Sequence, residues 1–224
     1  MIPIRDRSRR NGFPWVTFTI VVLLGIVYVW DRQWSLIGPR IVFADLAARP
    51  VDVMAAIRGG EKEPLVTLFT SIFLHANTAH VLGNVLFLWV FGPRVEGRFG
   101  PVLFMLYYLF WGVFASFTQI FVTPQSGVPM VGASGAIAGV MGSYFLLFPA
   151  ARIEAVILPF WFWPITVPAW LLLGLWFLLQ VFIVQPGVAN WAHAGGFLAG
   201  MLFVILVGDR RARERTRTAD TGLR

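Results

Sequence analysis

Two side chains in this sequence could together perform nucleophilic catalysis. Ser134 stands between small residues in the tetrapeptide Gly132-Ala133-Ser134-Gly135, and His193 lies in the last apolar segment of the chain. A serine hydroxyl becomes an effective nucleophile when a neighbouring base accepts its proton, and imidazole can return that proton to a leaving amine. Small neighbours would let a substrate backbone approach the hydroxyl. We therefore predict a serine–histidine pair, provided that the fold brings the two residues together.

A third segment offers hydrogen-bond donors for the same chemistry. His80 and Asn84 are four positions apart, so they share one face of a helix. An amide and an imidazole N–H could stabilise the oxyanion of a tetrahedral intermediate. His75 precedes this helix, and we expect it to fix the loop rather than to contact a substrate.

Each of these residues also has a structural interpretation, which the residues alone leave open. Ser134 could cap a helix, and His80, Asn84 and His193 could form hydrogen bonds between membrane helices. A metal site is not expected, because His75 and His80 are five positions apart and no carboxylate lies near them in the sequence. We expect no other cofactor.

The composition indicates the environment in which these residues act. Of the 224 residues, 58% are hydrophobic and only 13% are charged, whereas about a quarter of a typical soluble domain is charged. Much of the net charge of +7 comes from arginines in the two terminal tails, a distribution that argues against nucleic-acid binding. The chain has no cysteine, which excludes disulfides and thiolate metal sites. We predict a polytopic membrane protein.

Six apolar runs predict six transmembrane helices, although two of them are shorter than the roughly 20 residues that a span requires. They are Pro14–Trp30, Thr78–Phe91, Pro101–Val122, Ser134–Phe148, Pro168–Val184 and Trp191–Val207. This pattern predicts an all-α membrane domain over residues 14–208. A basic tail precedes it (1–13), a basic and disordered tail follows it (209–224), and a long first loop (31–64) lies outside. Since both tails are rich in arginine, we expect both termini to be cytoplasmic.

This topology predicts where the reactive side chains meet. The second, fourth and sixth spans all run from outside to inside, so His80, Asn84, Ser134 and His193 should converge near the outer face. The fourth span is too short to cross the whole hydrocarbon layer, so Ser134 should lie in a recess that opens to the extracytoplasmic side. The fifth span, Pro168–Val184, lacks glycine faces, and we predict that it moves to admit substrate.

Glycines on the fourth and sixth spans should allow the required contact. Gly135 and Gly139 share a face of one helix, and Gly196 and Gly200 follow His193 on a face of the other. Small-residue faces let the backbones of two membrane helices approach closely. We therefore expect these four glycines to support the site.

Taken in order, these segments resemble the rhomboid family of intramembrane serine proteases. The segment from His75 to Asn84 matches the family's H-x4-H-x3-N pattern, and Gly132-Ala133-Ser134-Gly135 matches its G-x-S-G motif. His193, followed by its two glycines, is similar to the family's histidine span. The resemblance covers about Leu65–Gly208.

The resemblance implies a six-helix rhomboid core in a bacterial inner membrane, with Ser134 as nucleophile and His193 as base in a dyad without a carboxylate. It implies an oxyanion site formed by Asn84, His80 and the backbone N–H groups of Gly132 and Ser134. The implied activity is endopeptidase cleavage of transmembrane protein substrates, through an acyl-enzyme. The oligomeric state stays open.

The chain departs from the family pattern in two places. Its first loop lacks a Trp-Arg pair that many bacterial members carry, and Ala138 stands where some members place an aromatic ring against the histidine. The sequence therefore leaves open which side chain orients His193. Gly92–Gly100 is similar to the family's turn after the second span, and we expect a turn there.

Two functions of other classes stay open. The chain could be a non-catalytic rhomboid-like scaffold that binds transmembrane clients, although an intact Ser134 and His193 weigh against this. It could also be a small transporter whose path is the polar cluster. Against a transporter, the polar residues lie near one face rather than at the midplane, and no inverted repeat is visible.

Overall fold

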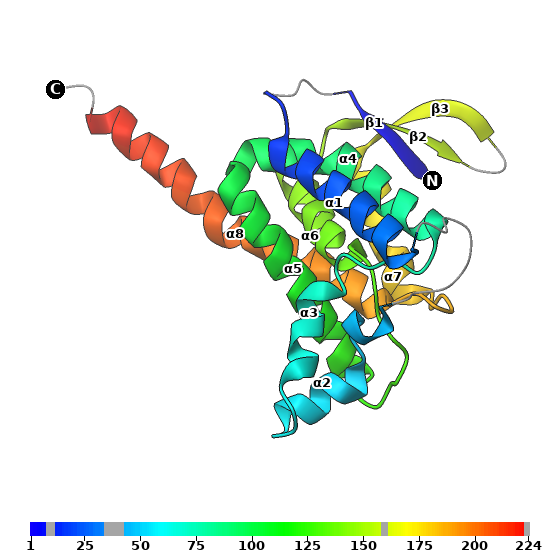
Figure 1. Ribbon diagram of the computed structural model, residues 1–224. Helices are drawn as coiled ribbons and strands as arrows, with labels where there is room; N and C mark the ends of the chain where they lie inside the picture. Colours follow the sequence, from blue (N-terminus) through cyan, green and yellow to red (C-terminus); the bar gives the residue numbers. More distant parts are fainter. Residues whose placement is uncertain (8–11, 34–42, 158–160, 222–224) are drawn as a thin grey trace.

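The computed structural model describes residues 1–7, 12–33, 43–157 and 161–221, which form a helical bundle with a small sheet at one end (Figure 1). The helices are α1 (Trp15–Asp31), α2 (Pro50–Ile57), α3 (Thr67–Thr70), α4 (Thr78–Phe99), α5 (Pro101–Val122), α6 (Ser134–Leu147), α7 (Ala169–Phe182) and α8 (Asn190–Thr221). The strands are β1 (Ile2–Asp6), β2 (Arg152–Ile157) and β3 (Trp161–Pro168), and two short 3-10 helices span Ala44–Leu46 and Glu63–Val66.

Each of the six long helices overlaps one of the six predicted apolar runs, and α4 and α8 extend beyond theirs. By length and hydropathy, α5 and the Asn190–Val207 part of α8 could cross a membrane, whereas α1, α6 and α7 are apolar but shorter. The short α2 and α3 lie at the end of the bundle opposite the sheet (Figure 1). In α2, Val53 is fully buried and packs with Leu68 and Ile120.

Helix α6 is the centre of the bundle, because all of its residues from Gly135 to Tyr144 are buried. Its contact with α8 depends on glycine. A Cβ atom at Gly196 would overlap the carbonyl oxygen of Gly135, and one at Gly200 would overlap that of Gly139. The predicted close approach of these two helices is therefore confirmed. Because the pairs follow in the same order, α6 and α8 run parallel.

The turn predicted over Gly92–Gly100 is wrong, because α4 continues as a helix to Phe99. Pro93 lies inside this helix, where its missing N–H removes one backbone hydrogen bond. Packing overrides that cost, since a Cβ atom at Gly92 would lie only 3.0 Å from the Thr17 side chain of α1. The helix ends at Gly100, whose φ of 86° favours glycine.

A buried carboxylate anchors this extended part of α4 to α1. Glu96 accepts hydrogen bonds from the backbone N–H groups of Val16 (3.0 Å) and Thr17 (2.8 Å) and from the Thr17 hydroxyl (2.7 Å). The first N–H groups of a helix have no partner within the helix, and negative charge there is favourable. Glu96 thus caps α1 and holds the two helices together.

The all-α prediction is wrong at one end of the bundle, where β1, β2 and β3 form an antiparallel sheet in that order. Residues 2–6, predicted to be part of a tail, form its first strand. The signal for β2 was an alternation in which the buried Ile153 and Ala155 follow the more exposed Arg152 and Glu154. Such an alternation is too short to identify a strand within a membrane protein.

The sheet is fixed to the bundle through Asp6 at the end of β1. Its buried carboxylate accepts a hydrogen bond from the Tyr144 hydroxyl of α6 and lies 3.6 Å from Arg94 of α4. The guanidinium of Arg94 also stacks over the Phe148 ring, 4.0 Å from its centroid. The sheet therefore lies at the end of α6 remote from Ser134.

Helix α8 leaves the bundle and continues to Thr221 (Figure 1). Residues 209–221, which belong to the predicted disordered tail, have a helical backbone, and residues 222–224 lie outside the described part. The segment after Asp209 is rich in arginine, which favours helix. This propensity can extend α8 without any apolar periodicity.

Candidate active site

The first turns of α4, α6 and α8 line one cavity of about 680 Å³. Its wall includes four of the residues singled out from the sequence, namely His80, Asn84, Ser134 and His193. The convergence of these segments is the arrangement that the topology predicts. Among the described residues, no Asp or Glu side chain lines this cavity, and no group of three or more His, Cys, Asp or Glu side chains could hold a metal ion.

Ser134 and His193 are in hydrogen-bond contact. The Nε2 atom of His193 lies 2.8 Å from Oγ of Ser134, a distance at which the hydroxyl can donate to the imidazole. Ser134 is the first residue of α6 and His193 lies in the first turn of α8. Both side chains are half-buried. The glycine contact between Gly135 and Gly196 lies immediately beside them and sets this separation.

Two residues of α7 hold the other side of the imidazole. The Nδ1 atom of His193 lies 2.7 Å from Oε1 of Gln180, and the Trp176 ring lies 5.7 Å from the His193 ring, tilted by 35°. The sequence left open which side chain orients His193, because Ala138 of α6 has no aromatic ring. In the structure this ring is Trp176 of α7. Our sequence reasoning missed both residues, although a glutamine within an apolar run was a signal, because polar side chains are costly in lipid.

The start of α8 is also held from α5. Gln119 accepts hydrogen bonds through Oε1 from the backbone N–H groups of Trp191 (3.1 Å) and Ala192 (3.3 Å). These groups belong to the first turn of α8, where no helical acceptor is available. Gln119 therefore caps the helix that carries His193, and it was not identified from the sequence.

His80 and Asn84 approach Ser134 from α4. The backbone N–H of His80 donates to Oδ1 of Asn77 at 2.9 Å, a side-chain cap that starts the helix. Asn84 is only 7% exposed, and its Nδ2 has no hydrogen-bond partner among the described residues. A buried amide donor without a partner is costly, which makes Asn84 available to a ligand in the cavity.

Gly132 does not provide the oxyanion donor that we predicted. Its backbone N–H already donates to the carbonyl oxygen of Ser71 at 2.8 Å. Its φ of 126° favours glycine, and a Cβ atom there would lie 2.7 Å from the His80 ring and 3.6 Å from Nδ2 of Asn84. Gly132 thus leaves room for the side chains of His80 and Asn84, and its N–H is not available as a donor to the oxyanion.

His75 is fully buried below the site. Its Nδ1 atom lies 3.2 Å from the carbonyl oxygen of Phe73, and its ring meets the His80 ring edge-on, with the centroids 5.1 Å apart. Burial and the nearby His80 lower the pKa of His75 to about 3, so the ring is neutral at physiological pH. The contacts agree with the expected role in fixing the loop.

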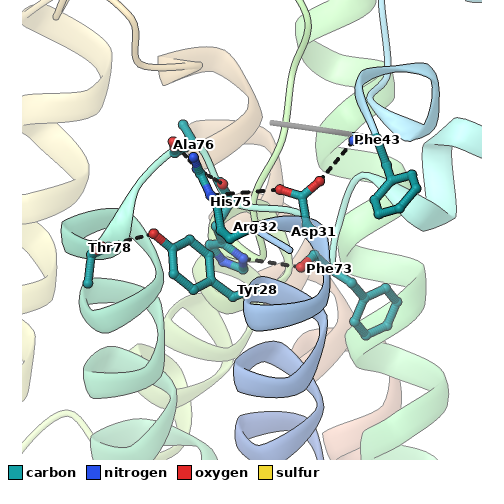
Figure 2. A network of polar contacts seen from close by, with 8 residues as sticks. All are labelled: Tyr28, Asp31, Arg32, Phe43, Phe73, His75, Ala76 and Thr78. Carbon is teal, nitrogen blue, oxygen red and sulfur yellow. Dashed lines mark hydrogen bonds and ion pairs between the residues drawn. The ribbon is translucent and has the colours of Figure 1, made fainter. Parts of the chain in front are cut away.

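An arginine braces the same loop from the end of α1 (Figure 2). Arg32 donates to the carbonyl oxygens of His75 (3.0 Å) and Ala76, and its Nε lies 3.8 Å from the buried carboxylate of Asp31. Figure 2 also shows the Tyr28 hydroxyl in contact with Thr78, 2.8 Å away. The segment that leads into α4 is therefore held by several polar contacts with α1.

The chain is similar to proteins of one family. Residues 62–210 match the Rhomboid domain family. The chain is 34% identical over 182 residues to RHOMBOID-like protein 1 of Arabidopsis thaliana, which covers 79% of this chain and 42% of that protein. It is 33% identical over 141 residues to Rhomboid protease GluP of Bacillus subtilis, with coverages of 63% and 26%. For Rhomboid protein 1, mitochondrial, of Saccharomyces cerevisiae, the identity is 29% over 165 residues, with coverages of 68% and 44%. The chain spans less than half the length of these three relatives.

Proposed function

Because this chain belongs to the rhomboid family, we propose that it is an intramembrane serine endopeptidase that cleaves transmembrane protein substrates. Membership makes it a polytopic membrane protein built as a helical bundle. The observation that carries the proposal is the 2.8 Å contact between Oγ of Ser134 and Nε2 of His193 inside a cavity. Such a pair has the geometry of a nucleophile and its general base.

In the proposed reaction, Oγ of Ser134 attacks the scissile carbonyl carbon while Nε2 of His193 takes the hydroxyl proton. The tetrahedral intermediate collapses to an acyl-enzyme when the imidazolium gives that proton to the leaving amine. A water molecule then attacks the ester, again with His193 as base, and releases Ser134 and the second product. The cavity gives water a path to these atoms.

Charge that develops on the carbonyl oxygen needs donors. Nδ2 of Asn84, which has no partner among the residues that the structure describes, and the imidazole of His80 are suited to this role. The backbone N–H of Ser134 lies at a helix start, where N–H groups lack helical acceptors. We assign the oxyanion site to these three groups. Gly132 is left out, because its N–H is bonded to Ser71.

We also propose six membrane spans, formed by α1, α4, α5, α6, α7 and α8, with both termini in the cytoplasm and the cavity open to the other side of the inner membrane. The parallel course of α6 and α8 supports this orientation, because it directs the arginine-rich part of α8 toward the end of the bundle that carries the sheet, remote from Ser134. Short loops rich in arginine favour the cytoplasmic side.

Cleavage of a single-span reporter by the purified protein in lipid vesicles tests the function. Wild type is expected to cut the reporter within or near its membrane segment, and Ser134→Ala should leave it intact. The same result should follow for His193→Ala. A wild type that binds the reporter without cutting it would make the protein a scaffold, and equal cutting by Ser134→Ala would contradict the proposed nucleophile.

A further inference from the structure

Gln180 is an unusual residue for its position. Helix α7 is otherwise made of apolar and aromatic residues and glycine, and Gln180 is buried with only 7% of its surface exposed. Burying an amide is unfavourable unless its hydrogen bonds are satisfied. Its side-chain oxygen, Oε1, lies 2.7 Å from Nδ1 of His193, the ring nitrogen that is turned away from Ser134.

The contacts of the Gln180 side chain fix which of its ends faces the imidazole. Its Nε2 donates to the carbonyl oxygen of Trp176 at 3.4 Å, and its Oε1 accepts from Nδ2 of Asn190 at 3.4 Å. Asn190 is itself held, since Nδ2 also donates to the carbonyl oxygens of Gln180 (3.3 Å) and Ile183 (3.0 Å). An oxygen therefore faces Nδ1 of His193.

An acceptor at Nδ1 determines the tautomer of a neutral imidazole. The nitrogen that faces Oε1 must carry the proton, so that Nε2 presents its lone pair to the Ser134 hydroxyl. The opposite tautomer would set two lone pairs against each other at 2.7 Å and would leave Ser134 without an acceptor. Only the first tautomer lets His193 act as base.

We propose that Gln180 is a positioning residue that holds His193 in its Nδ1–H tautomer and fixes the plane of the ring. This inference rests on the proposed function and adds a third member to its dyad. A carboxylate does this work in serine proteases that have a triad, whereas here the acceptor is a neutral amide. During acylation the Nδ1–H bond to Gln180 persists, while Nε2 gains the serine proton and later gives it to the leaving amine.

The origin of Gln180 has a consequence for the bundle. Ser134 and His193 lie on α6 and α8, which are locked together by glycine contacts, whereas Gln180 comes from α7. A displacement of α7 would remove the acceptor from Nδ1 while the serine–histidine contact stayed in place. The ability of His193 to act as a base therefore depends on how α7 packs against α8.

Kinetics on the single-span reporter test the proposal. Gln180→Leu keeps a similar volume but removes the acceptor, and we expect kcat to fall about 10- to 100-fold, the usual effect of losing a partner that orients a histidine, with KM little changed. Gln180→Glu retains an acceptor oxygen and should recover most of kcat. Its carboxylate stabilises the imidazolium, so the acidic limb of its pH–rate profile should move to higher pH.

The matched control is Gln185→Leu, because Gln185 is exposed five residues further on. It should keep the kcat and the pH profile of wild type. A Gln180→Leu variant with wild-type kcat would overturn the proposal. So would a loss confined to KM, or a loss that Gln185→Leu shares.

Nitrogen NMR of His193 separates this inference from the proposed function. In wild type at neutral pH, Nδ1 should carry the proton and Nε2 should not, with the signals assigned by their absence in His193→Ala. Gln180→Leu should show a mixture of both tautomers. A wild-type ring protonated at Nε2 would overturn the role of Gln180 even if the protein cleaves its reporter. Cleavage by Ser134→Ala would overturn the proposed function but would leave the assignment of the His193 tautomer intact.

Discussion

Each polar group around Ser134 has a neighbour that limits what it can do. His193 is bonded on both ring nitrogens, Gly132 has given its N–H to Ser71, and His75 is buried and bonded to Phe73. Two buried nitrogens near the site, Nδ2 of Asn84 and Nε2 of His75, have no hydrogen-bond partner within the described part of the chain, and of these two residues Asn84 lines the cavity. A buried donor of this kind in the cavity is suited to bind the oxyanion, whose charge develops only in the transition state.

We therefore expect Asn84→Ala to lower kcat by about 10²- to 10³-fold, the usual cost of losing one oxyanion donor. The midpoint of thermal unfolding should hardly change, because the amide nitrogen makes no bond that the folded protein would lose. Reporter kinetics and melting curves in detergent give the two values. Asn77→Ala is a contrasting variant, since it removes the cap of α4 and should cost about 1 kcal/mol of stability.

Sequence reasoning worked best for residues whose position depends on topology. Ser134 and His193 lie at the starts of parallel helices, so the order and direction of the helices were enough to bring them together. Gln180 was missed, although a lone glutamine in the apolar run of α7 was a signal, because the order of the helices does not show which residue of α7 faces His193. Gly132 was misassigned because its hydrogen bond goes to Ser71, which is distant in the sequence.

At the scale of elements, the packing of α6 against α8 governs the site. The backbones of the two helices meet at glycines, and a larger side chain has no space between them. The geometry of the serine–histidine contact is therefore a property of the helix pair. Rigid helices are better supports for such a contact than loops are.

Gly196→Ala should consequently reduce both stability and activity. The added methyl group would overlap the carbonyl oxygen of Gly135, which forces α6 and α8 apart, and we expect a loss of about 1 to 3 kcal/mol together with a fall in kcat. Gly25→Ala in α1 is the matched control, because a Cβ atom there meets nothing within 4 Å. Equal melting temperatures for Gly196→Ala and Gly25→Ala would contradict the close-packing account.

Helix α1 contributes to the site through the loop that leads into α4. Removing Arg32 would free the carbonyl oxygens of His75 and Ala76 and leave Asp31, whose side chain is 1% exposed, without its ion pair. We expect Arg32→Met to cost about 1 to 3 kcal/mol, since buried carbonyl oxygens that lose their donor are costly and the Asp31 carboxylate loses a nearby positive charge. Thermal unfolding measures this loss.

The double variant Asp31→Asn, Arg32→Met provides the control for that prediction. It removes both charges while keeping an acceptor for the backbone N–H of Phe43, which Asp31 binds at 3.0 Å. It should be more stable than Arg32→Met alone. Equal stability of wild type and Arg32→Met would show that the network of Figure 2 does not hold the loop.

At the scale of the whole molecule, the sequence predicted the helical bundle better than its ends. Apolar runs identify membrane helices because a lipid-embedded backbone must satisfy its own hydrogen bonds. The sheet was not predicted, since β1 can be recognised as a strand only from its pairing with β2, about 150 residues later. The extension of α4 to Phe99 was not predicted either, because Glu96 stabilises it through hydrogen bonds to α1, which the sequence does not show.

The whole account depends on one nucleophile activated by one base from a distant part of the chain. Labelling of the purified protein in lipid by a fluorophosphonate probe, which reacts with activated serines, tests this most directly. We predict strong labelling of wild type, none of Ser134→Ala, and a sharp reduction for His193→Ala. Equal labelling of all three proteins, or none of wild type, would contradict the claim that His193 activates Ser134.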